Sequence, residues 1–190
     1  MAGTLIVSNI EAQNYKYDSD TTAMIIDTSG NVTESNYVLD QWRLNTNFTS
    51  HGATINTGWE RPDNATHGRI GTGMTESSGI FTFPSTGLWM VTVCARMYVA
   101  GADGTVGIAV KVSSNGGGST STVASAYEGD TSSGNDNNGQ ATCIALINVT
   151  NASNFQVSLL TISVGSGSAI VGNTDENTTH ITFERKGNAQ

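Results

Sequence analysis

The chain has 190 residues, of which 13% are charged, and its formal net charge is -8 with only eight Lys and Arg. A surface that follows nucleic-acid phosphates needs clustered basic side chains, so this composition excludes a nucleic-acid-binding protein. No apolar run approaches the roughly 20 residues of a membrane-spanning helix, and the abundance of Ser, Thr, Asn and Gly beside Val and Ile is typical of a β-rich protein.

The first 39 residues predict an extended N-terminal arm. Short apolar bursts are separated by polar residues and are too short to bury a core of their own, so we expect the arm to pair with a partner surface or with its neighbours, either in particle attachment or between subunits. The candidate attachment residues are Leu5, Ile6, Val7, Tyr15, Tyr17, Ile25 and Ile26. The start of the chain, Met-Ala-Gly-Thr, lacks the basic and apolar regions of a secretion signal, so we expect either synthesis as a soluble protein in a cytoplasm or the removal of a preceding segment.

Residues 88–99 predict a long strand. Its odd positions, from Trp89 to Val99, are all apolar and are expected to face a core. Its even positions carry Met90, Cys94 and Tyr98, which are unfavourable in open water. The even face therefore indicates a subunit contact or a cover from another segment.

Four more strands follow. Residues 105–113 alternate, so one side is expected to be core and the other to face solvent. Residues 141–149 are apolar on both faces. This predicts a strand in the middle of a sheet whose two faces are both buried, as in an oligomer. Residues 155–164 change phase by one position, which predicts a β-bulge. The last strand is expected at residues 179–185.

These strands are joined by loops rich in Gly and Asn, notably residues 115–119 and 129–139. Helical periodicity is nearly absent. The pattern predicts an all-β, antiparallel jelly-roll sandwich over residues 40–190, preceded by the arm. Cys94 and Cys143 each lie in an apolar run and are expected to be free, buried thiols.

Residues 79–89, Gly-Ile-Phe-Thr-Phe-Pro-Ser-Thr-Gly-Leu-Trp, run directly into the longest strand. Their spacing resembles the signature of the globular head of complement and the tumour-necrosis-factor ligands. Pro84 stops strand pairing and Gly87 permits a tight return, and Phe81 is expected to pack with Trp89. The resemblance implies a ten-stranded jelly roll.

Residues 40–48, 59–61, 70–74 and 179–187 look like a variant of this head found in virion proteins of marine bacteriophages. The resemblance implies a homotrimer, with the doubly apolar strands near its three-fold axis. No collagen-like Gly-x-y repeat precedes residue 40, which argues against the animal complement function. The candidate trimer-interface residues are Met90, Cys94, Tyr98, Ile144 and Leu146.

Catalytic chemistry has little support. The three histidines are far apart, and neither a nucleophile elbow nor a phosphate loop is present, so we expect no enzymatic activity. The loop at 130–138 is rich in oxygen ligands, which suit calcium, but it lacks the spacing of a calcium loop and is more typical of a solvated loop, so we expect no cofactor, with calcium as the alternative. It is also the first candidate for receptor contact. Its candidate residues are Asp130, Asn135, Asp136 and Asn138.

Together these features predict a non-enzymatic structural protein of a bacteriophage virion, assembled in the host cytoplasm. It would be a trimeric jelly roll that acts as capsid decoration or as a short fibre tip, held by its arm to other virion proteins. The alternative is a carbohydrate- or receptor-binding module, either free or as the head of a tail fibre, that recognises a host glycan or protein. The sequence leaves the position on the particle and the receptor open.

Overall fold

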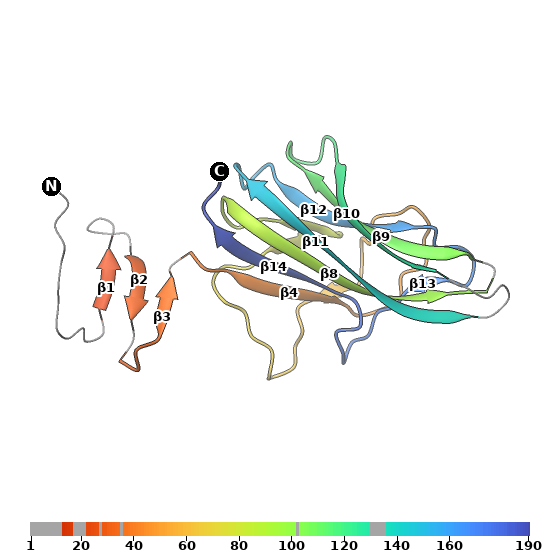
Figure 1. Ribbon diagram of the computed structural model, residues 1–190, viewed down its shortest axis with the longest axis horizontal. Coiled ribbons are helices and arrows are strands. Elements are labelled where there is room, and N and C mark those ends of the chain that lie inside the picture. Colours follow the sequence, from red (N-terminus) through yellow and green to blue (C-terminus); the bar gives the residue numbers. More distant parts are fainter. Residues whose placement is uncertain (1–12, 17–21, 27, 35, 102, 130–135) are drawn as a thin grey trace. The chain divides into compact units, whose positions relative to one another are not determined.

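The computed structural model describes residues 13–16, 22–26, 28–34, 36–101, 103–129 and 136–190 (Figure 1). The chain forms two units, Met1–Tyr37 and Val38–Gln190, which we call the N-terminal unit and the head. All regular elements in the described ranges are β-strands. Within those ranges, no helix is long and apolar enough to cross a membrane.

The N-terminal unit contains a small antiparallel sheet, in the order β1 (Gln13–Lys16), β2 (Thr22–Ile26) and β3 (Val32–Glu34). Of the candidate attachment residues, Tyr15 lies in β1, and Ile25 and Ile26 lie in β2. The other four, Leu5, Ile6, Val7 and Tyr17, lie outside the described residues. The described strands of the N-terminal unit therefore pair with one another, and attachment to a particle or pairing between subunits stays a prediction.

The head consists of two antiparallel sheets. The first has the order β10 (Ser121–Gly129), β9 (Thr105–Ser113), β12 (Gln156–Ile162), β7 (Ile80–Thr82) and β6 (Thr75–Ser77). The second has the order β11 (Asn137–Val149), β8 (Gly87–Val99), β14 (His180–Gly187), β4 (Leu39–Leu44) and β5 (Trp59–Glu60), and β13 (Ala169–Ile170) also pairs with β8.

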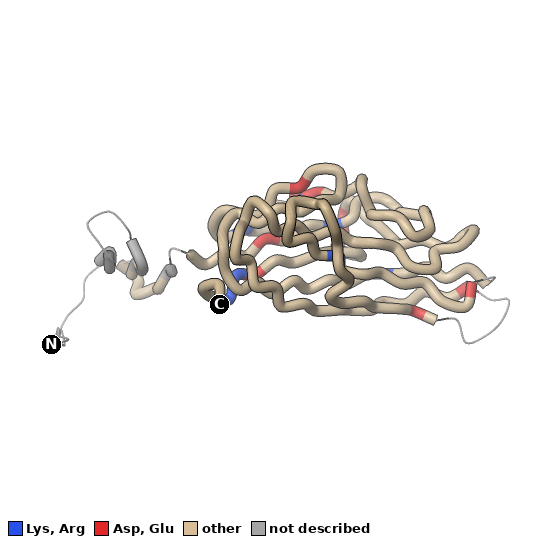
Figure 2. Tube along the Cα trace, turned by 90° about the horizontal axis from the view of Figure 1, so that it is seen from above, with Lys and Arg blue, Asp and Glu red and all other residues tan. Residues whose placement is uncertain are grey.

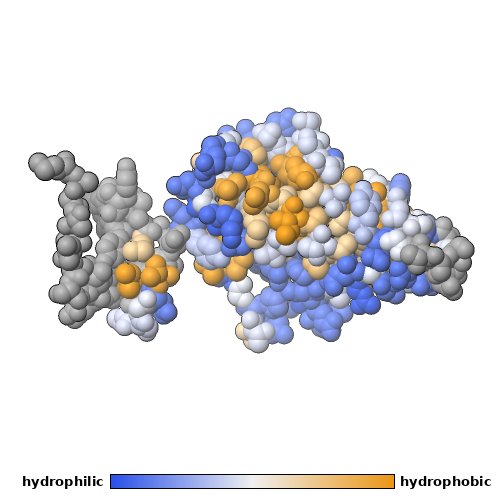
Figure 3. Space-filling view, viewed as in Figure 1, coloured by the Kyte–Doolittle hydropathy of each residue, from blue (hydrophilic) through white to orange (hydrophobic). Residues whose placement is uncertain are grey.

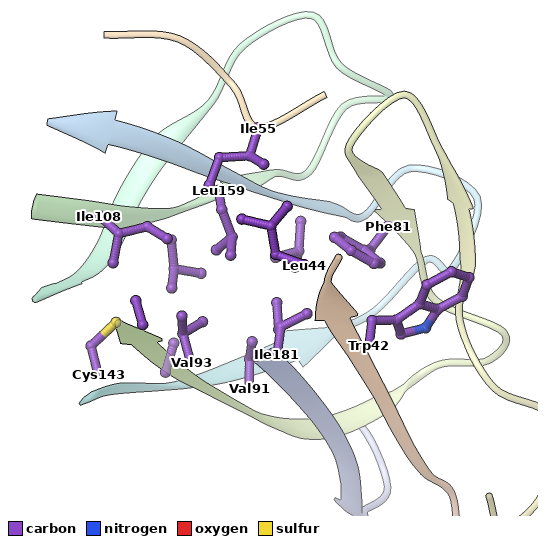
Figure 4. Packing of buried hydrophobic residues seen from close by; sticks show 14 of the residues in the cluster. Trp42, Leu44, Ile55, Phe81, Val91, Val93, Ile108, Cys143, Leu159 and Ile181 are labelled. Carbon is purple, nitrogen blue, oxygen red and sulfur yellow. The ribbon is translucent and has the colours of Figure 1, made fainter. Parts of the chain in front are cut away.

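The core lies between these two sheets. The odd positions of β8, from Trp89 to Val99, are fully buried, which confirms the predicted alternation. Val91 and Val93 of β8 face Leu159 of β12 across the sandwich (Figure 4). The predicted all-β, antiparallel sandwich is thus confirmed, because both sheets bury their inner faces against each other.

Aromatic packing at one end of the core differs from the expectation. Phe81 makes edge contacts with Trp42 and Trp59, at centroid distances of 5.7 and 5.4 Å. Trp89 instead packs with Phe83, at 5.2 Å. Phe81 and Phe83 are two positions apart and both point into the core, so only the tertiary packing decides which of the two rings meets Trp89.

Two predictions for β9 and β12 are wrong. The side of β9 away from the core is covered in part: Ala109 is buried, and the ring of Tyr127 lies across Gly107, where a Cβ would approach it to 2.5 Å. No β-bulge interrupts the pairing of β12 with β9. Instead Thr161 takes an inward position, and its hydroxyl donates to the Ser50 carbonyl at 2.6 Å, so the apolar phase changes without an extra residue.

The position of β11 also differs from the expectation. Residues 141–149 were expected in the middle of a sheet, but β11 is the outermost strand and pairs with β8 only, among the described strands. Cys143, Ala145 and Ile147 face the core. The alternate residues Ile144 and Leu146 face outward, since the described part of the head supplies no second layer over them.

Candidate functional site

The outward face of β8 and β11 is the candidate site. The antiparallel register places Leu146 opposite Met90, Ile144 opposite Thr92, and Thr142 opposite Cys94. On the other side of β8, Cys94 lies opposite His180 of β14. Side chains at such paired positions are neighbours on one face of a sheet, so these strands build one continuous surface.

This surface exposes large apolar side chains. Ile144 is 58% exposed and Leu146 is 66% exposed, while Met90 and Cys94 are half-buried beside them. Hydrophobic residues gather on the face that Figure 3 presents, over β8 and β11. We call the outward-facing residues Met90, Cys94, Ile144 and Leu146 the apolar patch.

The patch is poor in charge. Residues 137–149, which form β11, include no charged residue and no proline, and Arg96 is the one charged residue among the outward positions of β8. Charged residues are sparse along the described trace, and long stretches of the strands carry none (Figure 2). Natural edge strands are usually protected by charges, prolines or short length, so a 13-residue uncharged edge strand is typical of a surface that another chain covers.

Both cysteines are free thiols, as predicted. Cys143 is buried in the core, and burial raises the pKa of its thiol. Cys94 is only half-buried and lies on the outward face, where Thr142 Oγ1 donates to its sulfur at 3.4 Å. The expectation of two buried thiols therefore holds for Cys143 alone.

The structure brings four of the five candidate interface residues together in the apolar patch and places the fifth, Tyr98, toward the far end of β8. There the Tyr98 hydroxyl donates to the carboxylate of Asp136, which also accepts from the Gly101 N–H at 3.1 Å. The Tyr98 hydrogen bond, together with that from Gly101, lowers the pKa of Asp136, and the same pairing raises the pKa of Tyr98. Asp136 is thereby hydrogen-bonded both to the end of β8, at Tyr98, and to the segment that follows it, at Gly101.

The candidate apical loop is only partly within the described residues. Asp130 and Asn135 lie outside them. Asn138, expected in the loop, lies inside β11 opposite Tyr98, because β11 begins earlier than its apolar residues suggest. In the described part of the chain, no group of three His, Cys, Asp or Glu residues is arranged to hold a metal ion.

Two features of the head escaped the sequence analysis. Residues 121–129 form β10, with Val123 46% exposed and Tyr127 half-exposed. Alternation of Val123, Ser125 and Tyr127 with small apolar residues is the signal that could have found this strand. The second feature is a charge network around Asp40 and Arg61, whose members are far apart in the sequence and carry no shared motif.

No model of a protein family matches the sequence, and no curated protein matches it. Among solved structures, the chain is similar to Eiger TNF from S. frugiperda, with 12% sequence identity, a TM-score of 0.62, and coverage of 81% of this chain and 95% of that one. It is also similar to murine APRIL in a crystal structure at pH 5.0, with 11% identity, a TM-score of 0.57, and coverage of 79% and 99%. At such identities the likeness establishes the fold alone: the head is an all-β jelly-roll sandwich of the tumour-necrosis-factor type.

Proposed function

We propose that this protein is a non-enzymatic structural protein of a bacteriophage virion, whose head is a homotrimeric jelly roll displayed on the particle as capsid decoration or as a short fibre tip. The observation that carries the proposal is the exposed, charge-poor apolar patch on the edge strand β11 and its neighbour β8. The tumour-necrosis-factor type of fold and the resemblance of residues 40–187 to phage virion heads support it.

The patch supports self-association because its exposure is costly. Fully burying a Leu or Ile side chain contributes roughly 1.5–3 kcal/mol, and both Ile144 and Leu146 are more than half exposed in the head. A stable contact needs about 800 Å² from each partner, so the uncharged neighbours Thr92 and Thr142 must join it. Copies of one chain supply a surface of matching polarity, and a closed ring satisfies the patch on every copy.

The N-terminal unit supports attachment to the particle. Its described strands have three to five residues each, and a sheet of this size is marginal without a partner surface. The boundary between this unit and the head lies between Tyr37 and Val38, because most contacts of each unit are made within that unit. We therefore assign particle attachment to this unit and display to the head, with assembly in the host cytoplasm.

The first test is the mass of the purified full-length protein, measured by sedimentation equilibrium. We expect three times the chain mass of 19.8 kDa, because the patch would be buried between copies. A monomer at micromolar concentration would contradict the proposed assembly.

The second test is immunogold labelling of purified virions with antibodies against the head. Label over the shell supports capsid decoration, and label at fibre tips supports a fibre head. Absence of the protein from purified particles would refute the virion role and favour the alternative of a free binding module.

Removing residues 1–37 tests whether the N-terminal unit attaches the protein to the particle while the head folds and assembles without it. We expect the remaining head to keep its β-rich circular dichroism spectrum and its oligomeric mass, since its core is complete without them. The same variant should be missing from virions assembled in the presence of wild-type capsid proteins. Normal incorporation of the truncated protein would overturn the assignment of attachment to the N-terminal unit.

A further inference from the structure

A second site lies in the same head, at the opposite side of the six-stranded sheet from β11. It is an open pocket of about 360 Å³, which falls in the usual size range of small-molecule sites. The residues come from β4, from the segment that follows β5, and from residues 67–69. Its polar and charged lining residues are Asp40, Gln41, Arg61, His67 and Arg69.

The back wall of the pocket is preorganised around Asp40, which is 1% exposed. Its carboxylate accepts from Trp42 Nε1 at 3.0 Å and from the Met74 N–H at 2.7 Å. Arg61 binds both of its oxygens, each at 3.0 Å. Because the carboxylate is neutralised and saturated with donors, it acts as a scaffold for Arg61 and leaves little negative field in the pocket.

Arg61 is held from two further directions. Its guanidinium lies 4.2 Å from the centroid of the Trp42 ring, and its Nη2 donates to the Met74 carbonyl at 2.6 Å. A guanidinium that is already stacked and hydrogen-bonded loses little conformational entropy when a ligand arrives. The side chain of Arg61 remains 36% exposed, so it is accessible from the pocket.

Arg69 supplies the positive charge of the pocket. It is exposed, and it makes no ion pair or hydrogen bond to any described residue. Its backbone position is fixed, because the adjacent Ile70 exchanges two hydrogen bonds with Leu39, at 3.0 and 3.1 Å. The lining contains two arginines and one carboxylate, so its net charge is positive, although the whole chain has a net charge of -8.

Gly73 makes this arrangement possible. A Cβ at residue 73 would lie 2.3 Å from Asp40 Oδ2 and 2.7 Å from Arg69 Cδ, so any larger residue would displace one of them. The backbone approach at Gly73 therefore lets the buried carboxylate and the stem of Arg69 occupy the same small region.

Amide and imidazole side chains line the rest of the pocket. Gln41 is held by Thr182 and Asn177, at 2.8 and 2.7 Å, and His67 Nε2 lies 3.1 Å from the Asn177 amide nitrogen. Such fixed amide and imidazole groups suit the hydroxyl groups of a sugar ring, which both donate and accept.

We propose that this pocket binds an acidic sugar, with the ligand carboxylate held by Arg69 and Arg61 and the ring hydroxyls directed at Gln41 and His67. A planar guanidinium matches a carboxylate in a bidentate geometry, which a compact pocket can exploit. The site deepens the receptor-binding alternative for the head, but it does not depend on trimer formation, because every residue named comes from one chain.

The test is a titration of the full-length protein, followed by isothermal calorimetry and by amide chemical shifts. The ligands are D-glucuronate, its uncharged methyl ester, inorganic phosphate and a glucuronate-containing oligosaccharide. We expect D-glucuronate to bind and the methyl ester to bind about ten-fold more weakly or less, since a charge-assisted hydrogen bond is lost. Tighter binding of the oligosaccharide than of the free acid indicates a polymeric source, and equal binding indicates the free acid.

Arg69→Ala should weaken glucuronate binding by about ten-fold or more, and Arg69→Lys by less, because the charge remains without the bidentate fork. Arg69 is exposed, so both variants should keep the wild-type melting temperature. Lys111→Ala is the matched control, because it removes a partly exposed cation on β9 outside the pocket, and it should leave binding unchanged.

Equal affinity for D-glucuronate and its methyl ester would overturn the proposal, as would equal loss in the Arg69 and Lys111 variants. Binding of phosphate with no binding of glucuronate would also overturn it in favour of a phosphate site. These outcomes are separate from the sedimentation result, so a monomeric protein that binds glucuronate refutes the trimer and supports the pocket.

Discussion

Leu146→Asp is the sharpest perturbation of the proposed assembly. Leu146 is 66% exposed in the head, so the monomer loses little buried area when the side chain is replaced. Fully burying a Leu side chain contributes roughly 1.5–3 kcal/mol, and two thirds of this side chain remain to be buried by assembly. The substitution therefore removes about 1–2 kcal/mol of hydrophobic stabilisation from each contact between subunits.

Three equivalent contacts multiply this loss to about 3–6 kcal/mol for a trimer, which corresponds to a decrease of about 10²–10⁴-fold in the association constant. The new carboxylate adds the cost of removing a charge from water beside Met90, with no cation opposite it in the β8 register. We therefore expect Leu146→Asp to sediment as a folded monomer at concentrations where the wild-type protein is a trimer.

Val123→Asp is the matched control, because Val123 is 46% exposed and lies on β10 of the other sheet. It introduces the same carboxylate at an apolar surface position outside the patch and should keep the trimer mass. Circular dichroism of both variants checks that the head is folded. A Leu146→Asp protein that remains trimeric, or a Val123→Asp protein that dissociates equally, would refute the assignment of the interface to the patch.

Three further predictions concern polar contacts of the head. Thr161→Val should lower the free energy of unfolding by about 1–3 kcal/mol in urea titrations, since it leaves the Ala53 N–H without its 3.1 Å acceptor, and Thr161→Ser should restore most of that loss. Asp40→Asn should cost about 3 kcal/mol by the same assay, because Arg61 loses its charged partner; a loss no larger than that of a surface substitution would contradict the scaffold role. Tyr98→Phe should raise the pKa of Asp136 toward its ordinary value in a carboxyl NMR titration. Since that pKa is lowered in the folded state, the stabilisation is present at neutral pH and is lost as the pH falls through it, and an unchanged titration would contradict the pairing.

The sequence by itself determined much of the head. Alternation over residues 88–99 identified the core face of β8, because side chains of a strand point to opposite sides with a period of two. The resemblance of residues 79–89 to the tumour-necrosis-factor signature implied the jelly roll, and that motif can be recognised because it is contiguous in the chain. The apolar residues on both faces of these strands also predicted the members of the apolar patch. Alternation alone does not determine which of the two faces is exposed in the folded head.

Tertiary structure decided everything that depends on which distant segments become neighbours. Strand β11 is apolar on both faces, yet only the strand order shows that it is an edge and that Ile144 and Leu146 are exposed. The pocket around Arg61 and Arg69 joins residues 40–41 to residues 61–69, and Gln41 to Asn177, across 136 positions of the chain. Local periodicity predicts on which side of its own strand each side chain lies. The neighbours of each strand, the segments that cover its faces and the ion pairs of its charged residues depend on the pairing of segments that are distant in the sequence.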